Sequence, residues 1–294
     1  MKDKSGVLLK AWQSCMMAFW KGKYGKRNLL ALVLFPMIAF MLFRWFEHSQ
    51  IYHPYSAHES SPEAIGREFK EVYLGDKPKL HAWFFPAQQG SARTNLTFLI
   101  CHGNGGNISH RLDLCDLLLE TGANVFIFDY RGYGRSSGRP SEEGTYADAQ
   151  AAYGWLKQNG FASEQIIALG ESLGGAVAAE LAVREKLGGL ILQSTFTCIP
   201  DIGAELFSWL PVRQICSIHY DTGRKLPGLK LPVMVMHSRS DTLIGFQHAE
   251  KNFAIANEPK LFWELKGNHN DTLVTDSQIY FRGIEEFLTL LEQK

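Results

Sequence analysis

From Tyr52 to the C-terminus, short apolar segments alternate with longer segments of helical periodicity. The later apolar segments, such as VFIFDY and VMVMH, are continuous, which is typical of strands that helices cover on both faces. The first two segments flank Gly75-Asp76 and predict an antiparallel hairpin. The alternation therefore predicts an α/β fold, with a mostly parallel sheet, helices on both faces and an antiparallel N-terminal edge.

The boundaries of the expected elements follow from the same pattern. Strands are expected at 69–74, 80–85, 96–101, 124–129, 165–169, 189–192, 233–237 and 260–265. Helices are expected at 109–121, 145–158, 173–185, 246–255 and 277–291. One long interruption, residues 195–230, is rich in leucine and aromatic residues. Its place in the order predicts a short cap over the carboxyl edge of the sheet, where such folds bind ligands.

The N-terminal region carries an apolar stretch of the length that a membrane helix needs. Residues Leu29–Phe43 include no charge, and two aromatic residues extend the stretch to residue 46. We expect residues 29–46 to form an uncleaved single-pass membrane anchor. The alternatives are a cleaved signal peptide, which would need an unusually long charged region, and a buried core helix.

Residues 1–28 form a basic segment in front of this stretch. They contain seven Lys and Arg residues and one acidic residue, Asp3, so the positive-inside rule predicts a cytoplasmic N-terminus. Apolar residues between Leu8 and Phe19 recur at helical spacing. Such a helix would lie in the membrane interface or pack on the folded domain, and the sequence leaves both alternatives open. The folded domain is expected at residues 52–294.

Several classes of protein and site are disfavoured by composition. The 30 basic and 30 acidic side chains leave no net charge to attract nucleic acid. The five cysteines form no C-x-x-C pair, and the ten histidines form neither H-x-x-x-H nor H-x-H, so we expect no disulfide framework and no metal site. Gly132, Gly134 and Gly138 imitate a dinucleotide-binding motif, but Pro140 intervenes before any helix. No cofactor is expected.

The sequence around Ser172 predicts a nucleophile. Gly170-Glu171-Ser172-Leu173-Gly174 follows an apolar strand and precedes an alanine-rich helix, which is G-x-S-x-G in strand-turn-helix context. Such a turn forces the serine into a strained backbone conformation, so both flanking positions need glycine. An ordinary strand-to-helix turn is the alternative. The sequence does not decide whether Glu171 faces a pocket or solvent.

A serine nucleophile needs a histidine and a carboxylate on later loops. The strand VMVMH leads to Asp241 and the strand LFWEL leads to His269, so both side chains are expected at the carboxyl edge of the sheet. His269 would take the proton from Ser172, and Asp241 would orient the imidazole. Asp271 and Asp221 compete for the role of the acid.

An oxyanion hole is expected from two loops. His102-Gly103-Asn104-Gly105-Gly106-Asn107 follows the strand LTFLIC, and its glycines allow backbone N–H groups to approach a developing negative charge. We expect the N–H groups of Asn104 and Leu173 to be the two donors. The alternative for the glycine-rich loop is a helix-capping turn with Asn107 as N-cap, and both roles are compatible.

Four motifs together resemble one protein family, at 102–107 (HGNGGN), 129–138 (DYRGYGRSSG), 170–175 (GESLGG) and 267–271 (GNHND). They are similar to the α/β-hydrolase superfamily and, more narrowly, to its Bem46-like, ABHD13-type serine hydrolases, which carry one N-terminal membrane segment. The resemblance covers about residues 52–291. It implies Ser172, Asp241 and His269 as the triad, and relatives among esterases, lipases and thioesterases. The segment SRSDTLIGF around Asp241 departs from the family, which usually shows His-Gly before the acid and proline after the apolar pair.

These observations predict a serine hydrolase that cleaves carboxylic esters or thioesters through an acyl-enzyme. The substrate is expected to be a small molecule or a lipid with an apolar acyl group, met at or near a membrane. The rival interpretation is a non-catalytic membrane-tethered binding protein on the same fold.

Overall fold

The computed structural model describes residues 25–293, so the expected basic segment lies almost entirely outside the described residues. The described chain divides into two units, which meet in sequence at Ile51 and Tyr52. The first unit contains one long helix, α2 (Gly25–Ile51), with Pro36 inside it. Its segment Ala31–Ile51 has a mean hydropathy of 1.4 and is long and apolar enough to cross a membrane. A signal sequence has the same properties.

The second unit contains ten strands and nine helices among its described residues. The strands are β1 (His53–Pro54), β2 (Lys70–Leu74), β3 (Leu80–Phe85), β4 (Thr97–Cys101), β5 (Gly105–Gly106), β6 (Asn124–Phe128), β7 (Ile166–Glu171), β8 (Gly189–Gln193), β9 (Val233–Ser238) and β10 (Lys260–Leu265). The α-helices are α3 (Leu112–Glu120), α4 (Glu142–Gln158), α5 (Leu173–Arg184), α6 (Ile199–Leu206), α7 (Val212–Ile215), α8 (Thr222–Lys225), α9 (Phe246–Ile255), α10 (Thr272–Thr275) and α11 (Ser277–Glu292). Short 3₁₀ turns lie at Pro62–Ile65, Ile108–Arg111, Ser163–Gln165 and Leu226–Gly228.

Eight strands form one sheet in the order β10-β9-β8-β7-β4-β6-β3-β2. β3 pairs antiparallel with β2 and with β6, and the other neighbours are parallel. The expected mostly parallel sheet with an antiparallel N-terminal edge is therefore confirmed. Because the strands of the parallel part point the same way, the loops that follow them meet at one edge of the sheet.

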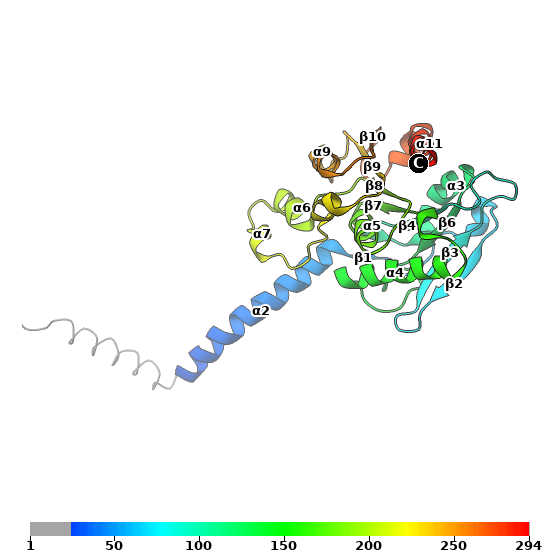
Figure 1. The fold of residues 1–294 in the computed structure, drawn as a ribbon. Coiled ribbons are helices and arrows are strands. Elements are labelled where there is room, and N and C mark those ends of the chain that lie inside the picture. Colours follow the sequence, from blue (N-terminus) through cyan, green and yellow to red (C-terminus); the bar gives the residue numbers. More distant parts are fainter. Residues whose placement is uncertain (1–24, 294) are drawn as a thin grey trace, which may run out of the picture. The chain divides into compact units, whose positions relative to one another are not determined.

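Helices cover both faces of the sheet, as the continuous apolar strands predict (Figure 1). Phe98 and Ile100 of β4 are fully buried in a core shared with α3 and α11. Phe126 of β6 faces the other way and packs against Trp155 of α4, with ring centroids 4.9 Å apart. Successive side chains of a strand point to opposite faces of the sheet, so one continuous apolar segment contributes to the apolar core on both faces.

Two features of the second unit are not expected from the sequence. The interruption at 195–230 carries the short helices α6, α7 and α8. In addition, β1 pairs in parallel with β5, so the start of the unit adds a two-residue strand to the glycine-rich loop after β4. Such a short pairing has no periodicity that a sequence pattern could reveal.

Candidate active site

Ser172 lies in a sharp turn between β7 and α5. Its backbone has φ 53° and ψ −114°, a conformation that side-chain-bearing residues rarely adopt. A Cβ at Gly170 would collide with the backbone of the first turn of α5, and a Cβ at Gly174 would collide with the carbonyl of Cys101. Both glycines are therefore required by close backbone approach, which is the steric reason for the G-x-S-x-G pattern.

Ser172, His269 and Asp241 lie together at the carboxyl edge of the sheet, each 7–8% exposed. His269 Nε2 is 3.1 Å from Ser172 Oγ, and His269 Nδ1 is 2.7 Å from Asp241 Oδ2. The serine hydroxyl can donate to Nε2 while the Nδ1–H donates to the carboxylate. The geometry joins a hydroxyl, a base and an orienting acid in one chain of hydrogen bonds.

The loops that carry Asp241 and His269 are joined by Asn268. Its Oδ1 accepts hydrogen bonds from the N–H of Thr242, at 2.9 Å, and from the N–H of His269, at 2.8 Å. Asp271 Oδ1 in turn accepts a hydrogen bond from the N–H of Asn268, at 2.5 Å. Among the described residues, Asp271 makes no hydrogen bond to the imidazole of His269. Asp271 thus braces the loop, whereas Asp241 faces the histidine.

The environment of Asp241 favours its ionised form. Burial by itself raises the pKa of this carboxyl, but the hydrogen bonds from His269 and from the backbone N–H groups of Leu243 and Ile244 outweigh it and lower the pKa. His237, near the end of β9, donates from Nε2 to the Ile244 carbonyl at 2.8 Å and lies 3.5 Å from Asp241 Oδ2. Burial lowers the pKa of His237, which keeps a neutral ring beside the carboxylate.

The two expected oxyanion donors belong to the residue after Ser172 and to the glycine-rich loop after β4. Leu173 is the first residue of α5, where helical N–H groups have no partner within the helix. Asn104 lines the same cavity as Ser172, and its carbonyl accepts from the N–H of His53 at 3.0 Å and from the Tyr133 hydroxyl at 2.8 Å. These bonds fix the plane of the Asn104 backbone. Asn107 caps the following 3₁₀ turn, so the helix-capping role expected as the alternative for this loop is present.

A cavity of about 460 Å³ opens onto Ser172 and His269. Its polar wall includes Glu171, which pairs with Arg111 at 3.1 Å. Burial raises the pKa of Glu171, but the Arg111 guanidinium outweighs it and lowers the pKa, so both groups are charged. The open question about Glu171 is thereby answered, since its side chain faces the cavity.

The apolar wall of the cavity comes from helices near the C-terminus and from α3. It includes Leu114 of α3, Leu273 and Val274 of α10 and Tyr280 of α11. None of the described residues that line this cavity belongs to the interruption at 195–230. A second cavity of about 530 Å³ shares Asp113, Leu273 and Val274 with the first, so the hollow continues along α3 and α11.

Comparisons with known proteins agree with this architecture. Residues 97–214 match the family described as alpha/beta hydrolase fold. The chain is 35% identical over 266 residues to the uncharacterized protein Rv2307c of Mycobacterium tuberculosis, with 89% of this chain and 94% of the relative covered. It is 31% identical to protein bem46 of Schizosaccharomyces pombe, with 78% and 79% covered. The chain is a Bem46-like α/β-hydrolase.

Among solved structures, this Bem46-like hydrolase resembles the Pyrococcus furiosus esterase Pf2001. The TM-score is 0.67, the sequence identity is 23%, and the match covers 81% of this chain and 98% of the esterase. At this identity the likeness shows a common fold. It therefore supports the α/β-hydrolase architecture. The relatives at 31% and 35% identity confirm the family predicted from the four sequence motifs.

Proposed function

We propose that this protein is a serine hydrolase that cleaves carboxylic esters or thioesters through an acyl-enzyme. The observation that carries the proposal is the hydrogen-bonded series of Ser172, His269 and Asp241, with the serine in a strained turn. His269 removes the Ser172 proton as Oγ attacks the carbonyl carbon, and Asp241 stabilises the imidazolium that forms. The backbone N–H groups of Leu173 and Asn104 would bind the oxyanion.

As the tetrahedral intermediate collapses, His269 gives this proton to the leaving alcohol or thiol, and the acyl group remains on Ser172. Water then attacks the acyl-enzyme with His269 as the base, and Ser172 is released. The residues present provide a nucleophile, a base and an orienting acid, which is sufficient for this chemistry. A binding protein with no catalytic role would have no use for the strained conformation of Ser172.

Labelling with a fluorophosphonate probe tests the proposal, because such probes react with an activated serine. We expect the full-length protein in detergent to be labelled at Ser172, as mapped by peptide mass spectrometry, and heat-denatured protein to remain unlabelled. An unlabelled native protein would favour the alternative, a membrane-tethered binding protein.

The proposed substrate is an apolar acyl compound met at a membrane. The apolar helix α2 would anchor the chain, with the basic N-terminus in the cytoplasm by the positive-inside rule. The apolar side chains of α3, α10 and α11 that line the cavity at Ser172 would hold the acyl chain, and each buried CH₂ would contribute about 0.8 kcal/mol. The interruption at 195–230, expected as a cap, is the alternative place for the acyl chain.

A tryptophan at Leu273 should shorten the acyl chains that the enzyme accepts. The side chain is half-buried and lines both cavities, so a larger ring would obstruct the passage between them. Loss of about two buried CH₂ groups would lower kcat/KM for long-chain p-nitrophenyl esters roughly 10-fold relative to the acetate. The measurement is a chain-length series with full-length protein in detergent.

The matched control is Leu206→Trp in α6, within the interruption at 195–230. Leu206 is 53% exposed and lies outside both cavities. Its replacement should leave the chain-length profile unchanged. If Leu206→Trp shifted the profile and Leu273→Trp did not, the acyl chain would lie under the cap instead. A wild-type profile that peaked at two or four carbons would overturn the lipid substrate and leave the hydrolase intact.

A further inference from the structure

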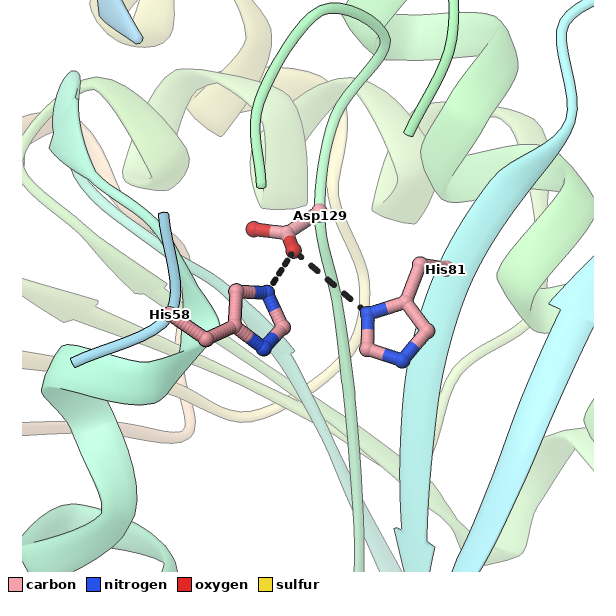
Figure 2. A group of neighbouring side chains, drawn as sticks. All are labelled: His58, His81 and Asp129. Carbon is pink, nitrogen blue, oxygen red and sulfur yellow. Dashed lines mark hydrogen bonds and ion pairs between the residues drawn. The ribbon is translucent and has the colours of Figure 1, made fainter. Parts of the chain in front are cut away.

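A second cluster of polar side chains lies away from Ser172, around Asp129. In the part of the chain from 25 to 293, His58, His81 and Asp129 form the one group of metal-binding side chains whose ligand atoms all lie within 4.8 Å of one another. Figure 2 shows both imidazoles turned toward the carboxylate. His58 Nε2 is 3.3 Å from Asp129 Oδ2, and His81 Nδ1 is 3.7 Å from the same oxygen.

The cluster is closed to solvent and its members come from separate parts of the chain. The side chains of His81 and Asp129 are fully buried and that of His58 is 7% exposed. His81 belongs to β3, Asp129 follows β6, and His58 lies in the segment after β1. Because the histidines are far apart in sequence, no H-x-H or H-x-x-x-H spacing could reveal the cluster. A metal site at this cluster would contradict the expectation of no metal site.

The hydrogen bonding of His81 leaves its Nδ1 atom facing the Asp129 carboxylate. Nε2 lies 2.9 Å from Glu71 Oε1, and a carboxylate only accepts, so this nitrogen carries the proton. In a neutral ring Nδ1 is then an acceptor, and it faces Asp129 Oδ2 with no hydrogen-bond donor between them. Two acceptors facing each other in a buried site are unfavourable unless a cation lies between them.

Gly134 lies against these atoms. Its backbone has φ 48°, and a Cβ at this position would collide with Asp129 Oδ2 and lie 2.9 Å from His58 Nε2. Glycine at residue 134 therefore lets the backbone approach the carboxylate and the imidazole closely.

We propose that His58 Nε2, His81 Nδ1 and Asp129 Oδ2 bind a divalent cation of the zinc type. Imidazole nitrogen and carboxylate oxygen are ligands that Zn²⁺ accepts, and bonds of about 2.0–2.1 Å in a tetrahedron place ligand atoms about 3.4 Å apart. The separations of 3.3 and 3.7 Å are close to that value. The Glu71 carboxylate on the far side of His81 supplies the carboxylate–histidine–metal arrangement seen in zinc proteins.

Such an ion would be structural. Asp129 Oδ1 accepts from the N–H of Ile108 at 3.0 Å, which connects the cluster to the 3₁₀ turn after the glycine-rich loop. His58 connects it to the segment that follows β1. The ion would therefore hold this segment against β3 and β6 and would take no part in the chemistry at Ser172.

Cobalt binding tests the site, because Co²⁺ takes the place of Zn²⁺ and has visible d–d absorption. Full-length, tag-free protein in detergent, freed of metal by chelator, should bind one equivalent of Co²⁺, which Zn²⁺ then displaces. His58→Gln should weaken the affinity by more than about 100-fold, and Glu71→Gln by roughly 10-fold through the orientation of His81. His58 lies outside the eight-stranded sheet, so this variant retains the main fold.

The matched control is His248→Gln. His248 is also fully buried, but it pairs with Thr197 and Glu205 away from the cluster, so cobalt affinity should stay at the wild-type value. Two results would overturn the proposal. If wild-type protein took up no cobalt, His81 would instead be an imidazolium that donates from Nε2 to Glu71 and from Nδ1 to Asp129. Equal affinity in wild type and His58→Gln would place the ion elsewhere.

Discussion

Replacing Ser172 with alanine should abolish the burst of p-nitrophenol that an acyl-enzyme produces from a short p-nitrophenyl ester. The hydroxyl lies 3.1 Å from His269 Nε2, and without it no covalent intermediate can form. Loss of one member of such a triad costs about 10⁴-fold or more in turnover, while the oxyanion donors still provide some acceleration over water. Stopped-flow absorbance measures the burst and the steady-state rate together.

Ser194→Ala is a suitable control for this variant. Ser194 follows β8 and also has a positive φ, of 48°. Its hydroxyl is buried, and among the described residues it makes no hydrogen bond to the imidazole of His269. Its removal should change turnover by no more than a few fold. If Ser172→Ala kept a rate within a few fold of wild type, Ser172 would not be the nucleophile.

Replacing Asp241 with asparagine should lower turnover by about 10³- to 10⁴-fold while leaving the fold intact. The backbone N–H groups of Leu243 and Ile244 donate to Oδ1, which asparagine retains. The amide that replaces Oδ2 carries no charge to stabilise the imidazolium of His269 and would hold the ring in the wrong tautomer. Steady-state kinetics and thermal unfolding of the same preparation separate the two effects.

Asp271→Asn distinguishes the two candidate acids. Asp271 accepts hydrogen bonds from the Asn268 N–H and the Thr275 hydroxyl at Oδ1, so an asparagine preserves both contacts. We expect turnover near the wild-type value and a loss of stability below about 1 kcal/mol. A larger loss of turnover in Asp271→Asn than in Asp241→Asn would transfer the orienting role to Asp271.

The strands and the candidate triad were predictable because each depends on a local pattern. The apolar segments before Asp241 and His269 are long enough to identify as strands, and parallel strands deliver their following loops to one edge. The glycines around Ser172 indicate close backbone approach without any knowledge of the neighbouring element. Order along the chain therefore sufficed to predict that these three side chains would converge.

Contacts between loops could not be predicted in this way. Asn268 joins two loops through its amide oxygen, yet in sequence it is one polar residue among several in GNHND. The apolar wall at Leu273 and Val274 depends on the placement of α10 and α3 around one cavity, which no periodicity encodes. The place of the interruption at 195–230 in the order of elements predicted a cap, and none of the described residues that line the cavity at Ser172 belongs to it.

The pairing of β1 with β5 determines where the folded α/β unit begins. Asn104 and Gly106 accept hydrogen bonds from the N–H groups of His53 and Tyr55, and the Asn107 side chain donates to the carbonyls of Tyr55 and Ala57. A truncation designed from the large sheet alone, starting near Lys70, would remove all four bonds from the loop beside Ser172. The connecting residues after α2 thus support the glycine-rich loop, and proteolytic release of the domain would preserve this support only if cleavage occurred before His53.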